Sequence, residues 1–145
     1  MLMKKALVLS VMTLLLAACG SQQAEPKTAT AESPKDANGD YAKATVLVLD
    51  GKINDITLDE TSQGKSKVEL GTEGYNMKEA SKIGKHWHEQ VEFLENYIIK
   101  NGLDKVELDN KGYAKNDDVL AGCTINIGNM IETAKTAEAN ALKQE

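Results

Sequence analysis

Apolar and polar positions begin to alternate regularly near Tyr41, and this alternation predicts where the folded part of the chain starts. Two β-rich runs, 45–49 and 53–58, flank the pair Asp50-Gly51. An Asp-Gly pair between two such runs is a strong signal for a two-residue type I′ turn. We therefore predict an N-terminal β-hairpin. Because a lone hairpin is only marginally stable, other elements must cover one of its faces.

Two later segments repeat their apolar residues at helical spacing. The first predicted helix covers residues 76–100 and ends at Asn101-Gly102, a usual helix stop. Its apolar stripe consists of Ile83, Trp87, Val91, Leu94 and Ile98. The second predicted helix covers residues 128–142. Its buried side consists of Met130, Ala134, Ala137 and Ala141.

The remaining segments are polar and rich in glycine. We interpret 61–74 as a loop with a short strand around 68–70, and we predict a short strand at 105–108 and a turn at 110–112. Strands come first and helices later, without regular alternation. This order predicts an α+β fold, with a small, mostly antiparallel sheet packed against two main helices. The glycine-rich fingerprints of nucleotide-binding folds are missing.

The amino terminus has the features of an export signal. A basic start, "MLMKK", precedes the apolar run "ALVLSVMTLLLAA", which is too short to span a membrane and fits a secretory signal. Its end, "LLAAC", resembles the lipobox of bacterial lipoproteins, in which Cys19 would be the lipidated first residue. We expect a signal peptide at 1–18, a lipidated disordered tether at 19–40 and one domain at 41–145. This implies acylation of the palmitate type and a protein anchored to the extracytoplasmic face of the cell membrane.

Charge argues against nucleic acid as a partner. The formal charge of the chain is −5, and all 17 cationic side chains are lysines. No arginine fork is present to read bases or clamp phosphates. Removal of the signal would take away Lys4 and Lys5 and make the protein still more acidic. A lipidated Cys19 would leave Cys123 as an unpaired thiol.

The sequence identifies no catalytic residue and no metal site. The two histidines, His86 and His88, are two residues apart, and on a helix such side chains point in different directions and cannot chelate one ion. We interpret them as polar neighbours of Trp87. The many carboxylates between the helices do not single out a catalytic pair.

The stretch "DDVLAGCTI" remains to be explained. Small residues let a backbone approach another group closely, and the amides that open the following helix favour an anion. "DVLAGCT" resembles the flavinylation motif of the FMN-binding domain family. The resemblance implies that Thr124 accepts FMN through its phosphate, transferred from FAD by a separate flavin transferase. Asp118 would head the motif and Gly122 would be its glycine. Cys123 and Ala121 stand where alanine and a hydroxyl residue are common.

The resemblance extends over residues 39–142 and is to lipoproteins of Gram-positive bacteria that carry extracellular FMN-binding domains. It implies a flavoprotein for electron transfer, including extracellular electron transfer, and a carrier rather than a stand-alone enzyme. A quinone-linked dehydrogenase in the membrane would be a suitable electron donor. Tyr75 and Trp87 are candidates to lie against the flavin ring, and Lys65 or Lys67 could neutralise phosphate. The simpler interpretation is core packing for Trp87 and solvation for the lysines.

Two alternatives stay open at this point. The chain could be a surface lipoprotein that binds a ligand or partner without redox chemistry, or a domain that holds FMN without a covalent bond.

Overall fold

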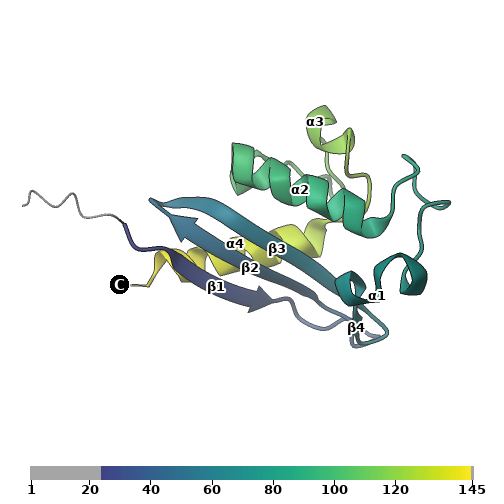
Figure 1. The fold of residues 1–145 in the computed structure, drawn as a ribbon, viewed down its shortest axis with the longest axis horizontal. Helices are drawn as coiled ribbons and strands as arrows, with labels where there is room; N and C mark the ends of the chain where they lie inside the picture. The colour runs from purple at the N-terminus through teal and green to yellow at the C-terminus, as the bar shows by residue number, and fades with distance from the viewer. Residues whose placement is uncertain (1–23, 145) are drawn as a thin grey trace, which may run out of the picture.

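The computed structural model describes residues 24–144, and it shows an α+β fold in which one antiparallel sheet is covered by helices (Figure 1). The sheet has the order β1-β2-β3-β4, formed by Lys27–Glu32, Ala42–Leu49, Lys52–Ser62 and Lys65–Ser66. The helices are α1 (Lys67–Gly74), α2 (Trp87–Asn101), the 3₁₀ turn η1 (Leu103–Lys105), α3 (Asp117–Leu120) and α4 (Gly128–Leu142). The predicted fold class is confirmed.

The predicted hairpin is confirmed as β2 and β3. Asp50 and Gly51 form the turn, with φ of 52° and 74°. Positive φ at both positions is what a type I′ turn requires. The strands are longer than the predicted runs, because β2 starts at Ala42 and β3 continues to Ser62.

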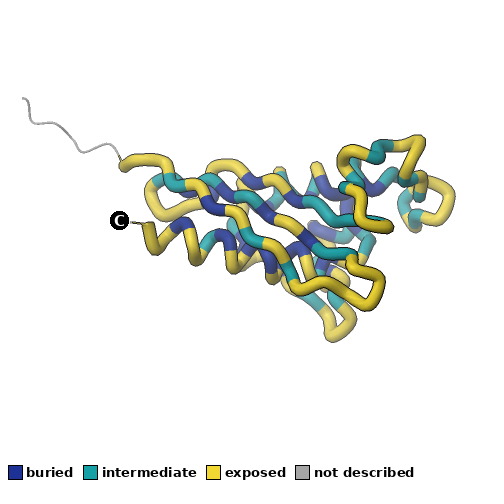
Figure 2. Tube along the Cα trace, turned by 90° about the horizontal axis from the view of Figure 1, so that it is seen from below, coloured by how far each residue is buried: buried dark blue, intermediate teal, exposed yellow. Residues whose placement is uncertain are grey.

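The core lies between one face of the sheet and the two long helices. Helix α4 packs across β1 and β2, and α2 packs along β3. Buried and exposed positions alternate along the strands (Figure 2). On the helices the buried positions fall on one stripe, as predicted, except that Ile83 lies before α2 and is only half-buried, and α4 has the predicted bounds. The buried residues of α4 are Met130, Ile131, Thr133, Ala134, Ala137 and Ala141. The alanines let α4 approach the sheet closely.

The folded domain begins earlier than predicted. Residues 27–32, expected to be part of a disordered tether, form β1 and pair with β2 from Lys27↔Val48 to Glu32↔Lys43. Residues 33–41 then connect β1 to β2. At the other end of the chain, the Gln144 side chain donates to the Thr28 carbonyl at 2.9 Å and Lys27 bonds the Gln144 carbonyl. The two ends of the described chain therefore lie together (Figure 1).

The first helix was predicted too long at its start. Residues 76–86 form turns, with Gly84 at φ 64°, and α2 begins only at Trp87. The Glu89 carboxylate accepts the backbone N–H of His86 at 2.7 Å and thereby caps the new helix start. The predicted end at Asn101-Gly102 is confirmed.

Three shorter predictions were wrong or incomplete. Residues 68–70 belong to helix α1 instead of a strand. Residues 105–108 contribute only the end of η1 and a single bridge between Leu108 and Ala114. The short helix α3, which opens the motif, was not predicted. The turn at 110–112 is confirmed.

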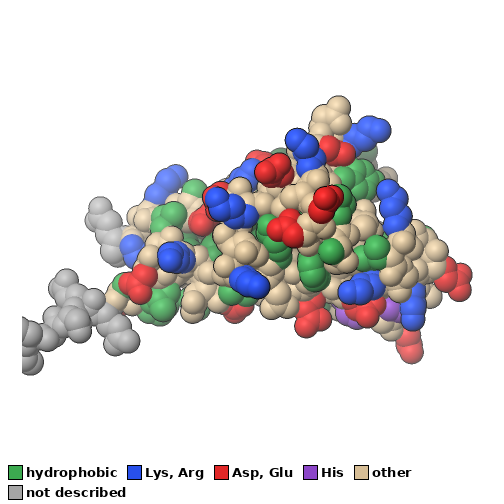
Figure 3. All heavy atoms as spheres, turned by 90° about the horizontal axis from the view of Figure 1, so that it is seen from above, with side chains coloured by type: hydrophobic (Ala, Val, Ile, Leu, Met, Phe, Trp, Pro, Cys, Tyr) green, Lys and Arg blue, Asp and Glu red, His purple; other side chains and the backbone are tan. Residues whose placement is uncertain are grey.

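The predicted signal peptide and Cys19 lie outside the described residues. Within 24–144, no helix combines the length and apolar character needed to cross a bilayer. Acidic and basic side chains are mixed over the face shown in Figure 3, so this face carries no patch of a single charge.

Candidate functional site

A cavity of about 470 Å³ opens where α1, the start of α2 and the start of α4 meet the turn at 110–112. Its walls combine aromatic, cationic and amide side chains with backbone. The lining residues are Glu60, Lys67, Tyr75, Met77, Trp87, Lys111, Gly112, Ile125, Asn126, Gly128 and Asn129. Ligand pockets commonly measure about 300–1,000 Å³, so a small organic molecule fits this volume.

Tyr75 and Trp87, both predicted as site residues, form one corner of the cavity. Their ring centroids are 6.4 Å apart and the rings are nearly perpendicular, at 87°. The Nζ atom of Lys67 lies over both rings, 4.6 Å from the centroid of Tyr75 and 5.4 Å from that of Trp87. The sequence suggested Lys65 or Lys67; the structure brings Lys67 to the aromatic pair.

Lys67 is held by an ion pair with Glu60 at 2.8 Å, and the two side chains are only 13% and 20% exposed. Burial works to lower the pKa of Lys67, but the hydrogen bond to Glu60 and its charge outweigh burial, so the pKa lies above the ordinary value. Lys67 is therefore a cation at neutral pH, fixed at the wall of the cavity.

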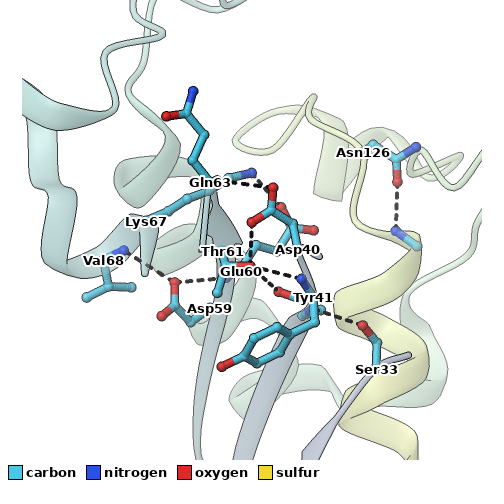
Figure 4. Close-up of polar contacts among 12 residues, drawn as sticks. Ser33, Asp40, Tyr41, Asp59, Glu60, Thr61, Gln63, Lys67, Val68 and Asn126 are labelled. Atoms are coloured by element: carbon cyan, nitrogen blue, oxygen red, sulfur yellow. Dashed lines mark hydrogen bonds and ion pairs between the residues drawn. The ribbon is translucent and has the colours of Figure 1, made fainter. Parts of the chain in front are cut away.

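The turn that leads into Lys67 is itself fixed by Asp40 (Figure 4). The Asp40 carboxylate accepts the Thr61 hydroxyl at 2.9 Å and the backbone N–H groups of Gln63 and Gly64 at 3.1 and 2.9 Å. The bond from Gly64, followed by that from Thr61, lowers the pKa of Asp40. Gln63 and Gly64 both have positive φ, at 54° and 76°. The carboxylate thus stabilises a tight turn and places Lys67.

Buried nitrogen atoms without a partner occur at this corner. Among the described side chains, His86 Nδ1 and Trp87 Nε1 are buried and make no hydrogen bond. A buried donor without a partner is costly, and such groups are rare in native structures. The indole N–H of Trp87 is therefore a buried donor without a partner among the described residues.

Thr124, the predicted acceptor, is half-buried and lies next to the cavity along the chain, because Ile125 and Asn126 line it. Its contacts are to Gln90 on α2. The Thr124 N–H donates to Gln90 Oε1 at 2.9 Å and its hydroxyl donates to the same oxygen at 3.3 Å. Gln90 lies one helical turn after Trp87, so Thr124 is close to the aromatic corner.

The turn before Thr124 is tightly packed. An ideal Cβ at Gly122 would lie 2.3 Å from the Phe93 ring, so only glycine fits there. The backbone N–H groups of Gly122 and Cys123 both donate to the Val119 carbonyl, at 3.1 and 2.9 Å. The turn is closed by backbone, and the exposed Ala121 side chain does not take part. Cys123 is fully buried, and burial raises the pKa of its thiol to about 11.

Asp118, predicted as the head of the motif, points elsewhere. It is exposed, and its carboxylate accepts the Tyr97 hydroxyl at 2.8 Å and the Asn116 amide at 2.9 Å. It does not line the large cavity. The structure therefore separates Asp118 from Tyr75 and Trp87, the predicted site residues that line the cavity.

The opening of α4 also differs from the expectation of a free anion site directly after the motif. Helix α4 starts at Gly128, four residues after Thr124, and the Gly128 N–H donates to the Asn126 side chain at 3.1 Å. Gly128 and Asn129 do line the cavity, so the positive end of the helix faces it.

The histidines stack on each other, which the helical interpretation did not predict. The rings of His86 and His88 are 5.7 Å apart and inclined by 17°. This is possible because His86 precedes α2 instead of lying within it. In residues 24–144, no cluster of three metal-ligating side chains is found.

Comparison with known proteins supports the fold. No family model and no curated protein matches the chain. Two solved structures of Northeast Structural Genomics Consortium targets are similar to it. A solution structure from Clostridium thermocellum shares 26% identity at a TM-score of 0.55, over 83% of this chain and 95% of the other. A crystal structure from Clostridium perfringens shares 24% identity at a TM-score of 0.59, over 84% and 93%. The likeness concerns the fold.

Gln90 is the site residue that sequence reasoning missed. A signal was present, because Gln90 occupies a position three residues after Trp87 inside the apolar stripe, where a polar side chain must find buried partners. Asn126 and Asn129 gave no comparable signal, since polar residues near a helix start are common.

Proposed function

We propose that this protein is an electron carrier on the extracytoplasmic face of the membrane, with FMN attached through its phosphate to Thr124. The observation that supports the proposal is that residues from segments far apart in the sequence line one cavity. Tyr75, Trp87 and Lys67 line the same cavity as Ile125 and Asn126, which directly follow Thr124. Tyr75 and Trp87 were candidates from sequence alone, and Lys67 was one of two lysines suggested.

The residues present fit a flavin. Tyr75, which is half-buried, offers surface for a flat, polarisable ring system, and Trp87, only 3% exposed, supports Tyr75 from the core. Lys67, Lys111, Asn126 and Asn129 supply cationic and amide donors around it, and the start of α4 adds its partial positive charge. The Trp87 Nε1 atom has no partner among the described residues but is itself buried, so the donors that face the cavity are those of the lysines and asparagines.

A bound FMN would supply one- and two-electron redox chemistry. In this proposal, Thr124 fixes the cofactor and Lys67 supplies a cation in a partly dry environment, where a charge acts more strongly than in water. Tyr75 binds and orients the ring, and Trp87 holds Tyr75 in place from the core. A covalent bond suits a protein outside the cytoplasm, where lost cofactor could not be replaced from a cytosolic pool.

The proposed partners are the membrane, through lipid on Cys19, a flavin transferase, and a membrane electron donor such as a quinone-linked dehydrogenase. Since β1 starts at Lys27, the chain between the anchor and the sheet is much shorter than the predicted tether of residues 19–40.

The test is production of the full chain together with a flavin transferase, followed by mass analysis of the tryptic peptide 116–135, which contains Thr124. We expect a gain of one FMN less one water and flavin fluorescence that survives denaturation. Thr124→Val, of nearly equal shape, should show neither. Ala121→Ser in the same turn is the matched control and should be modified like the wild type.

The other outcomes separate the alternatives. Flavin colour that is lost on denaturation, without a mass gain, would favour FMN held without a covalent bond. A colourless protein with an unmodified peptide, although the transferase modifies a known substrate in parallel, would refute the flavin proposal. It would favour a lipoprotein that binds a ligand or partner without redox chemistry.

A further inference from the structure

Gln90 is a fully buried polar side chain whose amide hydrogen-bonds on both sides. It is 0% exposed. On one side, Nε2 donates to Ser81 Oγ at 3.0 Å and to the Lys85 carbonyl at 3.2 Å. On the other, Oε1 accepts the N–H and the hydroxyl of Thr124. Gln90 thus connects the turn before α2 to the motif.

These partners fix which way the amide points. The Thr124 N–H can only donate, so it requires the oxygen of Gln90. The Lys85 carbonyl can only accept, so it requires the nitrogen. A flipped amide would lose both bonds inside a dry interior, where such losses are costly. The acceptor therefore stays directed at Thr124.

We propose that Gln90 is a positioning residue for the modification of Thr124. The inference rests on the proposed function. Because Oε1 holds the hydroxyl hydrogen, the lone pairs of Thr124 Oγ1 are directed away from Gln90. Residues 24–144 give Oγ1 no other hydrogen bond. A transferase would then meet a hydroxyl whose orientation is already fixed, which lowers the entropy cost of reaction.

The covalent step needs no change of oxidation state. Thr124 Oγ1 forms a bond to the phosphorus of FAD that carries riboflavin, and the bond from this phosphorus to the bridging oxygen of the diphosphate breaks. AMP leaves, and a base of the flavin transferase takes the hydroxyl proton. The products are the phosphodiester of threonine and riboflavin, AMP and one proton.

Esterification also changes the contact with Gln90. The ester oxygen has no hydrogen, so the hydroxyl bond at 3.3 Å is lost, while the backbone bond at 2.9 Å can remain. Gln90 would hydrogen-bond the Thr124 side chain only before modification. It would hydrogen-bond the Thr124 backbone N–H both before and after modification.

The test compares Gln90→Met, which keeps the volume but removes the acceptor, with Gln90→Glu, which keeps the acceptor. Full-length proteins are incubated with FAD and transferase, and the peptide containing Thr124 is followed by mass. We expect Gln90→Met to lower kcat of modification about 10- to 100-fold with KM for FAD little changed. Gln90→Glu keeps the acceptor but loses the bond to the Lys85 carbonyl, so it should react faster than Gln90→Met and slower than the wild type.

Val91→Ala is the control for lost stability, because it truncates a neighbouring buried side chain and leaves the contacts of Thr124 in place. Hydrogen exchange of the Thr124 amide in the unmodified protein gives a second readout, and Gln90→Met should lose protection there. If Gln90→Met does not fold, Ser81→Ala, which loosens Gln90 from its far side, should slow modification by a smaller factor.

The two hypotheses fail differently. A wild-type protein that is not modified would refute the proposed function. A modified wild type together with a folded Gln90→Met, or Ser81→Ala, that reacts at the wild-type rate would overturn the role of Gln90. The same holds if Gln90→Met slows modification no more than Val91→Ala does.

Discussion

Glu95 on α2 is the side chain that we expect to make stability depend on pH. Its carboxylate accepts the backbone N–H of Leu58 in β3 at 2.7 Å. Burial raises the pKa of Glu95 to about 7, and the negative charges of Asp55, Glu92 and Asp59 act in the same direction, while the bond from Leu58 opposes them. The folded state therefore holds a proton that the unfolded state has released.

The sign and size follow from the two pKa values. Below pH 4.5 the group is protonated in both states, and its contribution to stability is fully present. As the pH rises from 4.5 towards 7, the unfolded chain ionises first and stability falls. The difference between the unfolded pKa of 4.5 and the folded pKa of about 7 sets an upper limit of about 3.4 kcal/mol on the stability lost. Because Glu95 is only half-buried and solvent screens its charge, we expect a loss of about 1–2 kcal/mol.

The perturbation is Glu95→Gln, whose carbonyl can still accept the Leu58 N–H. We expect the variant to match the wild type near pH 5 and to be more stable by about 1–2 kcal/mol at pH 8. The assay is urea unfolding at several pH values between 5 and 8, with the slope m checked for constancy. Glu79→Gln, an exposed glutamate that is not among the charges acting on Glu95, is the control and should leave the pH dependence of the wild type nearly intact. Parallel pH profiles for wild type and Glu95→Gln would refute the reasoning.

Two further predictions concern the motif. Gly122→Ala should destabilise the protein by about 1–3 kcal/mol, because its Cβ would lie 2.3 Å from the Phe93 ring; urea unfolding measures this, and an unchanged midpoint would contradict the packing described. Cys123, which is buried and has its pKa raised to about 11, should react with a thiol reagent at pH 8 only after unfolding. Absorbance of the released chromophore would follow the reaction, and rapid labelling of the native protein would show that the thiol is accessible.

The sequence predicted those elements that are specified by neighbouring residues in the chain. The Asp50-Gly51 turn and the bounds of α4 could be read from sequence because turn chemistry and helical period specify them directly. Strand β1 could not, because "KTATAE" has small side chains and little apolar character. It is ordered by β2 and by Gln144, which lies 116 residues from Thr28.

The sequence predicted which residues belong to the candidate site better than it predicted how these residues are arranged. Tyr75 and Trp87 were identified as aromatic candidates, and they do line one cavity. The motif alone could not show that Asp118 bonds Tyr97 and faces away, since that contact comes from α2. Likewise, a glutamine in an apolar stripe indicates a buried polar contact but does not name its partner.

If the proposed lipid anchor holds the chain, the closeness of the two ends of the described chain gives the molecule a polarity with respect to a membrane. Helix α4 runs from the cavity, at Gly128 and Asn129, to Leu142, a span of about 22 Å for its 15 residues, and Gln144 just beyond it lies beside β1. On the proposed function, the lipid at Cys19 lies eight residues before Lys27, within about 28 Å of fully extended chain.

With α4 perpendicular to the membrane, the cavity would face away from the bilayer, towards soluble acceptors. A donor within the bilayer could reach the cavity only when the domain tilts towards the membrane. Lengthening the segment before Lys27 should therefore speed electron transfer from a membrane donor and leave transfer to a soluble acceptor unchanged. Equal rates with the short and the long segment would mean that the attachment does not limit how the domain meets its donor.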